Sequence, residues 1–196
     1  MSEEQVVEAA VQLAASVGLE NVSMRALAQR LGVPVMTIYN YVPNKDALYE
    51  LVLNFVLRAV RVPEPDEGTW EDRLKQLERD ARAALSTFPG LSFDRRGSTE
   101  GERLADGVMS ILADAGFSTT DASLAFATLF TFMVGQIDID VDFAEAGGAA
   151  AQAVQSAASS AHLSRDAIFE FGFDAVIQGL KLKLPSSQKP RRAAPR

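Results

Sequence analysis

The amino-acid sequence predicts an all-α protein, with a small N-terminal unit of three helices followed by a larger C-terminal helical bundle. Three observations support this prediction. Apolar residues recur at helical spacing in every convincing segment, and no stretch alternates between polar and apolar residues with a period of two. Glycine, proline and N-capping residues separate the segments at intervals that suit helices.

Composition narrows the class of protein. Hydrophobic residues make up 47% of the 196 residues, which is enough for a buried core. The absence of cysteine excludes disulfides, thiolate catalysis and cysteine-based metal sites. The start, MSEEQ, is acidic and unlike a secretion signal, and the longest apolar stretch, 122–134, falls short of the ~20 residues that span a bilayer. We therefore expect a soluble, cytoplasmic protein without membrane contact.

The charge is unevenly distributed along the chain. The formal net charge is −7, and residues 62–180 alone carry eight basic and twenty acidic groups, a net charge of −12. Residues 21–45 contain Arg25, Arg30 and Lys45 and no acidic residue. This pattern is compatible with a compact DNA-contacting surface on an acidic body, and it excludes a broad, non-specific nucleic-acid binder.

The N-terminal segments are short and clearly bounded. Ser23 is placed to cap a helix that Gly32 ends. A third helix is expected over 34–41, with Pro34 in its first turn. Asn44 is placed to cap a fourth helix over 44–60, which would connect the two parts of the chain.

A proline- and acid-rich segment, VPEPDEG at 62–68, is the clearest break in the chain. Capping residues and stops then place helices at 69–87, 99–115, 121–137 and 164–183, and an Ala-rich, weak helix is expected after Gly147-Gly148, before the last of them. We predict a head domain over 1–45, a regulatory and dimerisation domain over 46–184, and a disordered basic tail over 185–196.

Residues 24–43, MRALAQRLGVPVMTIYNYVP, have the pattern of a helix-turn-helix. Ala28 is small where the second helix must cross the first, and Gly32 tolerates the positive φ of the turn. Apolar side chains for the small core are supplied by Leu27, Leu31, Val33, Ile38 and Tyr41. An ordinary helical hairpin is the alternative interpretation.

The same run resembles the tetracycline-repressor family of bacterial regulators over about residues 5–58. The resemblance is carried by Ala28-x-x-Leu31-Gly32-Val33, by Tyr39-x-Tyr41, and by Asn44-Lys45-x-Ala47-Leu48. A weaker resemblance to the regulatory domain of the tetracycline repressors runs from Trp70 to Phe88-Pro89-Gly90, then Gly135, Phe171-Gly172-Phe173-Asp174 and Gly179. The acidic start, Ala14 in place of an aromatic residue, and Tyr41-Val42 in place of His-Phe depart from the family pattern.

The resemblance implies that the helix at 34–41 enters the major groove of double-stranded operator DNA. The residues it would bring to the DNA are Arg25, Val35, Met36, Thr37, Tyr39, Asn40, Tyr41 and Lys45. Val35 and Met36 would meet thymine methyls or sugar edges, and Thr37 would reach bases or phosphate. Arg25 would contact a guanine edge or phosphate, while the two tyrosines and Lys45 would contact phosphates. Tyr41 is also expected in the core, and Arg30 is expected to be solvated.

The resemblance also implies a ligand pocket between the helices at 69–87, 99–115 and 121–137. The helix at 121–137 carries apolar residues on all sides, so we expect it to be buried nearly all round. The expected lining residues are Trp70, Phe126, Phe130, Met133 and Gln136. A solid core without a cavity is the alternative. The expected effector is a neutral or cationic, hydrophobic or aromatic small molecule.

No metal or other cofactor is expected. Asp138, Asp140 and Asp142 alternate as in a calcium loop, but the glycine and glutamate that such a loop requires are absent, so we predict a solvated acidic loop. The chain has one histidine, His162, whereas tetracycline repressors bind a magnesium chelate through histidine in the regulatory domain.

A homodimer is predicted because one head reads too few base pairs for useful selectivity. The last helix is expected to form the interface through Ile168, Phe169, Phe171, Gly172, Val176, Gly179 and Leu180. Gly172 and Gly179 would allow a partner helix to approach closely.

The leading hypothesis is a ligand-responsive regulator, a repressor that binds a palindromic operator as a dimer and is released by a small hydrophobic effector. One alternative is a helical dimer whose head contacts proteins. Another is an α-helical enzyme, for which the sequence offers no nucleophile–base pair, glycine-rich phosphate loop or metal-ligand set.

Overall fold

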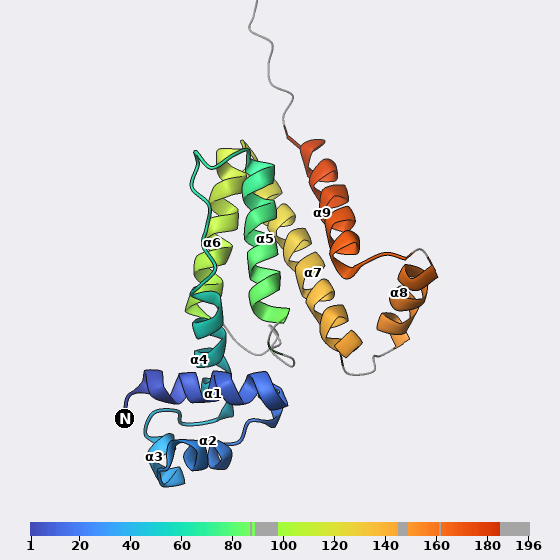
Figure 1. The fold of residues 1–196 in the computed structure, drawn as a ribbon. Helices are drawn as coiled ribbons and strands as arrows, with labels where there is room; N and C mark the ends of the chain where they lie inside the picture. Colours follow the sequence, from blue (N-terminus) through green and yellow to red (C-terminus); the bar gives the residue numbers. More distant parts are fainter. Residues whose placement is uncertain (87, 89–97, 145–148, 161, 185–196) are drawn as a thin grey trace, which may run out of the picture.

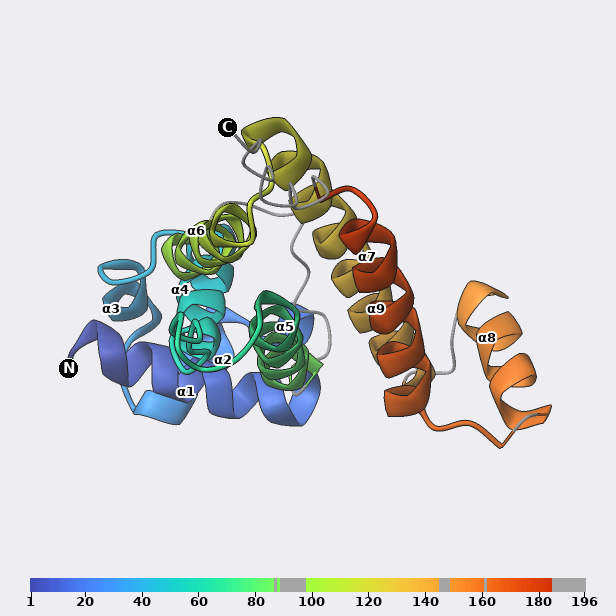
Figure 2. The same cartoon turned by 90° about the horizontal axis from the view of Figure 1, so that it is seen from above.

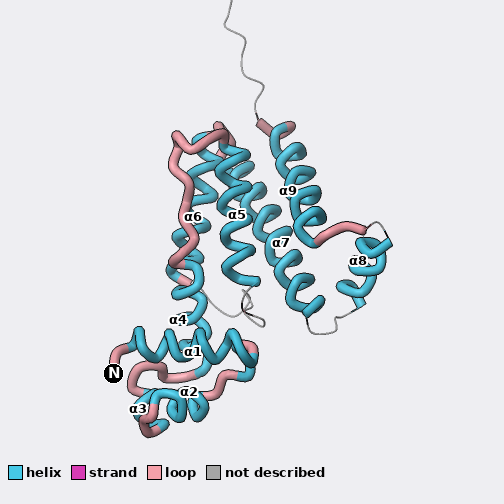
Figure 3. The backbone as a smooth tube through the Cα atoms, viewed as in Figure 1, coloured by secondary structure: helices cyan, strands magenta, loops and turns pink. Residues whose placement is uncertain are grey.

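The computed structural model describes residues 1–86, 88, 98–144, 149–160 and 162–184. Within these ranges the regular elements are helices, with no strand (Figures 1 and 3). The all-α class and the division into a small head and a larger helical bundle are confirmed. The predicted tail over 185–196 lies outside the described residues.

The head consists of α1 (Glu3–Val17), a 3₁₀ turn (Leu19–Asn21), α2 (Met24–Leu31) and α3 (Val35–Tyr39). Ser2 and Gln5 form a capping box at the start of α1. The Ser23 hydroxyl accepts a hydrogen bond from the Ala26 amide and caps α2, as predicted. Helix α3 is shorter than the expected 34–41, because it ends at Tyr39 and Asn40 is its C-cap residue.

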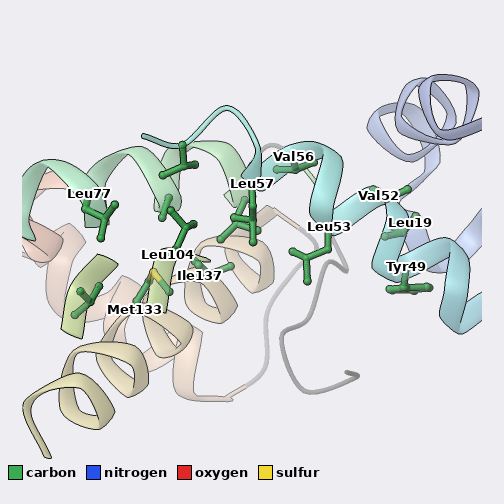
Figure 4. Packing of buried hydrophobic residues seen from close by; sticks show 14 of the residues in the cluster. Leu19, Tyr49, Val52, Leu53, Val56, Leu57, Leu77, Leu104, Met133 and Ile137 are labelled. Carbon is green, nitrogen blue, oxygen red and sulfur yellow. The ribbon is translucent and has the colours of Figure 1, made fainter. Parts of the chain in front are cut away.

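Helix α4 (Lys45–Leu57) connects the head to the bundle, and the side chain of Asn44 caps it. One continuous apolar core runs along this helix from the head into the C-terminal part (Figure 4). The buried residues that α4 contributes are Leu48, Tyr49, Val52, Leu53, Val56 and Leu57. Helix α4 is thus packed at both of its ends, against the head and against the C-terminal part.

The C-terminal part is built from α5 (Trp70–Ser86), α6 (Thr99–Asp114), α7 (Thr119–Ala144), α8 (Ala149–Ser160) and α9 (Arg165–Lys181). Helix α7 packs against α5 and α6 on one side and against α9 on the other (Figures 1 and 2). Helix α8 packs against α7 and stands at the edge of the bundle (Figure 2). The helices at 70–86 and 99–114 agree with their predicted positions to within one residue at each end.

Helix α7 differs from its prediction in two ways. It continues to Ala144, so the backbone at 138–142 is helical and the predicted acidic loop is wrong. It is also not buried all round, because Leu124 is 63% exposed and Phe130 is partly exposed. The physical reason is that α5, α6 and α9 of one chain cover only part of its circumference.

Ion pairs join α5 to α9 along the outside of the bundle. Arg79 binds the carboxylate of Glu170 through both Nε and an Nη atom, at 2.5 and 2.7 Å. Lys75 Nζ lies 2.8 Å from Glu170 and 2.7 Å from Asp174. The hydrogen bond from Arg79 lowers the pKa of Glu170 to about 2. These pairs hold α9 in register beside α5.

Candidate DNA-binding surface and effector cavity

The turn between α2 and α3 has the geometry that the sequence predicts. Gly32 adopts a left-handed conformation with φ of 67°, and the Val33 amide donates to the Ala28 carbonyl at 3.0 Å. Ala28 and Ile38 are buried between the two helices. The head is therefore a helix-turn-helix, and α3 is its second helix.

The exposed side of α3 and its C-cap carry four of the eight residues predicted to contact DNA: Met36, Thr37, Tyr39 and Asn40. Met36 is 72% exposed and Tyr39 is 42% exposed, so both side chains are free to contact a partner on the outward face. Asn40 is exposed as well, and Thr37 is partly buried. This outward face has the chemistry of a recognition helix, although contact with bases remains a prediction for each residue.

Two of the residues predicted to contact DNA are partly buried in the core of the head. Val35 and Tyr41 are half-buried and pack against the apolar cluster of the head. The Tyr41 hydroxyl donates a hydrogen bond to the Met1 carbonyl at 2.6 Å. Tyr41 thus fixes the N-terminus of the chain against the helix-turn-helix.

The three cations of the head occupy different positions. Arg25 is exposed near the start of α2 and forms no hydrogen bond or ion pair within the described residues. Lys45 is exposed at the start of α4, where its Nζ donates to the Glu20 carbonyl and lies 5.9 Å from the centre of the Tyr49 ring. Arg30 donates to the Gln12 amide oxygen at 2.5 Å, so it supports packing of α2 on α1 instead of being merely solvated.

A cavity of about 60 Å³ lies between α5, α6 and α7, and the end of α4 closes one side of it. Phe126, Phe130 and Met133 of α7 line it, as three of the five predicted pocket residues. Its use as a ligand site remains a prediction.

The other two predicted pocket residues lie elsewhere. Trp70 makes an edge-to-face contact with Phe117, with ring centroids 5.5 Å apart, at the start of α5. Gln136 is not among the residues that line the cavity. Both predictions relied on family resemblance and helix position, which do not determine the direction of a single side chain.

Glu78 of α5 is the one polar side chain among the described residues that line the cavity. It is 4% exposed, and its Oε2 atom has no hydrogen-bond partner in the described structure. Burial raises the pKa of this carboxyl to about 8, because the charged form loses its hydration.

Sequence reasoning missed Glu78, although the pattern contained a signal. The buried apolar residues of α5 are Leu74, Leu77, Ala81 and Leu85. Glu78 lies four residues after Leu74 and three before Ala81, on the same face of the helix. A carboxylate on an apolar stripe indicates either a buried partner or a ligand.

Hydrogen bonds connect the cavity wall to the connecting helix α4. Asn54 Oδ1 accepts from the Ser98 hydroxyl at 2.7 Å and from the Glu100 amide at 3.0 Å, at the first turn of α6. Arg103 of α6 donates to the carbonyls of Leu57 and Val60, at 3.2 and 2.8 Å, at the end of α4. Helices α4 and α6 are therefore tied together at two points beside the cavity.

The predicted interface residues on α9 divide into two groups. Phe169 is 1% exposed and stacks with Phe173 in the core, so it is not available to a partner helix in this fold. A side chain at Gly172 would meet Phe132 of α7 at 2.6 Å, so this glycine serves packing within the chain. Phe171 is 79% exposed, and a side chain at Gly179 would meet open space. Ile168, Val176 and Leu180 are half-buried.

A recognition helix held clear of the body of the molecule, on a head joined to a helical domain, is the arrangement of a helix-turn-helix transcription regulator. Two family models match the chain: bacterial regulatory proteins of the tetR family over residues 6–52, and the tetracyclin repressor-like C-terminal domain over residues 62–150. The chain belongs to the tetR family of bacterial regulatory proteins, which are transcription regulators rather than enzymes.

Two curated relatives show the extent of the similarity. The class A tetracycline repressor protein from transposon 1721 of Escherichia coli is 31% identical, and the match covers 95% of each chain. The HTH-type transcriptional repressor DrrR1 of Streptomyces coeruleorubidus is 32% identical over 67% of this chain. That match spans about half of the length of DrrR1, 51%.

Solved structures agree with this assignment. The structure of ActR from Streptomyces coelicolor in complex with actinorhodin has a TM-score of 0.79 and 25% identity, and covers 95% of this chain and 98% of ActR. A possible TetR family regulator from Streptomyces coelicolor A3(2) has a TM-score of 0.78 and 26% identity, with 92% of this chain and 99% of that chain covered.

The segment Thr119–Ile137 of α7 is long and apolar enough to cross a membrane, by length and composition alone. One such helix is weak evidence for a membrane span, because a core helix passes the same test. The segment packs against α5, α6 and α9 and supplies Phe126, Phe130 and Met133 to the cavity, which accounts for its composition. Within the described residues, no group of three or more His, Cys, Asp or Glu side chains is placed to hold a metal ion.

Proposed function

We propose that this protein is a cytoplasmic repressor that binds a palindromic operator as a homodimer and leaves the DNA when a small hydrophobic effector enters its C-terminal domain. The observation that carries the proposal is the pairing of an exposed recognition helix with an apolar cavity, connected by α4. In this proposal residues 1–45 form the DNA-binding domain and residues 46–184 the regulatory domain.

Each head would place α3 in the major groove of one half-site. Met36, Thr37, Tyr39 and Asn40 would face base edges and sugars, because they lie on or beside the outward side of α3. Arg25 and Lys45 would pair with phosphates on either side, since phosphate contacts fix the position of a head on the duplex. Val35 and Tyr41 would contribute less, because both also pack in the core.

The exposed apolar side chains of α7 and α9 support a dimer. Phe171 of α9 and Leu124 of α7 are among the most exposed large hydrophobic residues of the chain, and Phe130 of α7 is also partly exposed. Two neighbouring helices with apolar residues left uncovered fit a helix-to-helix interface with a second copy. Gly179, which has open space beside it, would let the partner approach.

The effector would act through α4. Leu57, the last residue of α4, lines the cavity, and Lys45, the first residue, lies beside the DNA-facing surface. A ligand between α5, α6 and α7 would displace α6, and the hydrogen bonds of Asn54 and Arg103 would carry that displacement to α4. The ligand must bind the displaced state more tightly than the DNA-bound state to shift the equilibrium.

Gel shifts with intergenic DNA beside the protein's own gene test this proposal. We expect salt-sensitive, sequence-selective binding at a palindrome, and release of the DNA by members of a library of hydrophobic and aromatic compounds. Equal retention of unrelated DNA of the same length would contradict a specific regulator. Selective DNA binding that no compound reverses would contradict the effector-controlled part.

A further inference from the structure

The carboxyl group of Glu78 combines three properties that are seldom found together. It lines the cavity, it is almost fully buried, and its Oε2 atom has no hydrogen-bond partner among the described residues. A buried carboxyl without a partner costs free energy, because it has lost the water that would solvate it. A ligand that supplies the missing partner would recover that cost.

We infer that Glu78 selects the effector, and that the effector is an apolar molecule carrying one amine group, whose ammonium form pairs with the Glu78 carboxylate. This inference rests on the proposed function, because it assigns a chemical class to the ligand of the same cavity. It adds a residue and a class of compound that follow from the carboxyl group itself.

The basic side chains one turn before and after Glu78 on α5 pair with acidic residues of α9. Lys75, one turn before Glu78, binds Glu170 and Asp174 of α9. Arg82, one turn after it, binds Asp166 of α9 at 2.9 Å and lies 4.8 Å from the centre of the Phe169 ring. The two basic residues that could neutralise Glu78 from adjacent turns therefore serve the contact between α5 and α9.

The other residues of the cavity wall favour a ligand with an apolar skeleton. Among the described residues, those that line the cavity from α4, α6 and α7 have no titratable group; they include Leu57, Leu104, Val108, Phe126 and Met133. An apolar skeleton would satisfy these residues, and a second polar group on the ligand would be left without a partner.

Charge favours an amine over an acid. Residues 62–180 carry eight basic and twenty acidic groups, so the potential around the domain attracts cations and repels anions. A bound anion would also face the Glu78 carboxyl directly. An ammonium group instead stabilises the ionised carboxyl in a medium of low dielectric constant, and the proton that Glu78 holds at neutral pH is released to solvent as the pair forms.

The size of the cavity limits the first probes to single-ring compounds. At about 60 Å³ it is smaller than the ~150 Å³ cavity that accommodates benzene in another protein. Met133 of α7 lines the cavity and has a flexible side chain, so it can adjust its conformation as a ligand enters. Benzylamine, with benzyl alcohol and benzoate as its neutral and anionic counterparts, matches these requirements.

The test measures the dissociation constants of benzylamine, benzyl alcohol and benzoate by NMR titration. The proteins are the full chain, Glu78→Gln, Glu78→Met and the control Glu102→Gln. Glu102 is an exposed residue of α6, so its substitution removes the same charge outside the cavity. Glu78→Met fills a similar volume without the unpartnered oxygen, and so keeps the test valid if the buried amide of Glu78→Gln disturbs folding.

We expect the unaltered chain and Glu102→Gln to bind benzylamine about 10-fold or more tightly than benzyl alcohol, the ratio that a charge-assisted hydrogen bond supplies, with benzoate weakest. Glu78→Gln and Glu78→Met should lose this preference while their affinity for benzyl alcohol stays within about 3-fold. Retention of the preference in Glu78→Met, or its loss in Glu102→Gln, would overturn the inference. Gel shifts of the same proteins separate the two proposals, because DNA binding does not depend on Glu78.

Discussion

The Ser98 hydroxyl of α6 donates a 2.7 Å hydrogen bond to the Asn54 amide oxygen of α4. Ser98 is buried, and Asn54 also accepts from the Glu100 amide at the free N-terminal turn of α6. One side chain of the connecting helix therefore caps the helix that forms a wall of the cavity. This contact joins α4 to the first turn of α6, the helix whose residues Gly101, Leu104 and Val108 line the cavity.

Asn54→Ala should weaken this connection between α4 and α6. The substitution leaves the buried Ser98 hydroxyl and the Glu100 amide without their acceptor, at a cost of about 1–3 kcal/mol, or roughly 2–4 °C in Tm for each kcal/mol. The effector concentration that releases DNA should also rise. Thr99→Val is the matched control, because it removes only the exposed 3.2 Å bond to Asn54. Unchanged thermal stability and unchanged release in Asn54→Ala would contradict the coupling.

Thr37→Ala and Tyr39→Ala should abolish selective operator binding without unfolding the protein. Each lost base or phosphate contact costs about 1–3 kcal/mol in each half-site of a symmetric dimer. Circular dichroism should show unchanged helix content, since neither residue belongs to the fully buried core. Normal operator selection by both variants would show that another face of α3 reads the DNA.

Lys45→Ala and Arg25→Ala should weaken binding to all DNA sequences alike and should reduce the salt dependence of binding. Each removed phosphate contact lowers the slope of log K against log salt by about 1. Arg30→Ala is the matched control, because Arg30 binds Gln12 within the head. If Arg30→Ala changed the salt slope as much as Arg25→Ala, the assignment of phosphate contacts to one face of α2 would be wrong.

Phe171→Glu should convert the dimer to a monomer. Phe171 is largely exposed in the single chain, so the substitution places a charge at the proposed interface without disturbing the core. Light scattering at micromolar concentration should show half the mass of the unaltered protein, together with weaker operator binding. Val17→Glu, on an exposed apolar residue of the head, should remain a dimer. A monomeric unaltered protein would remove the basis of the prediction.

Glu78 should make stability depend on pH. Its pKa is about 8 in the folded chain and about 4.5 when exposed, so between these values the folded chain holds a proton that the unfolded chain releases. The contribution of Glu78 to the free energy of unfolding is fully present below pH 4.5 and is lost as pH rises through 8.

Glu78→Gln, which has no proton to lose, should therefore gain stability relative to the unaltered chain by on the order of 3 kcal/mol between pH 5 and pH 9. Thermal melts at both pH values measure the difference, and Glu102→Gln should show none. A difference between Glu78→Gln and the unaltered chain that is the same at both pH values would mean that Glu78 is hydrated or paired.

Local sequence signals predicted the fold well. Ser23, Gly32 and Asn44 begin or end helices as their chemistry requires, and capping residues and stops located α5 and α6. The end of α7 was not predictable, because isolated acidic residues at 138–142 are compatible with either a helix or a loop. The exposure of Leu124 and Phe130 on α7 was not predictable either. An apolar helix surface is normally covered, but the sequence does not show whether the same chain or a second chain covers it.

The candidate sites were predicted unevenly for the same reason. The outward face of α3 follows from helix geometry alone, whereas the cavity wall depends on how three helices rotate against one another. Trp70 lies on the correct helix and packs on Phe117 instead. Glu78 was overlooked because an acidic residue is normally assigned to a solvated face, although its spacing from Leu74 and Ala81 places it on the buried one.

Selection of bound duplexes from a random DNA library, at about 150 mM salt where non-specific phosphate binding is weak, tests the central claim most directly. The account predicts that the recovered sequences converge on a two-fold symmetric site, with half-site centres about one helical turn apart or slightly more. It also predicts that Thr37→Ala and Tyr39→Ala recover no such site. Recovery of sequences without a common motif by the unaltered protein would contradict the account.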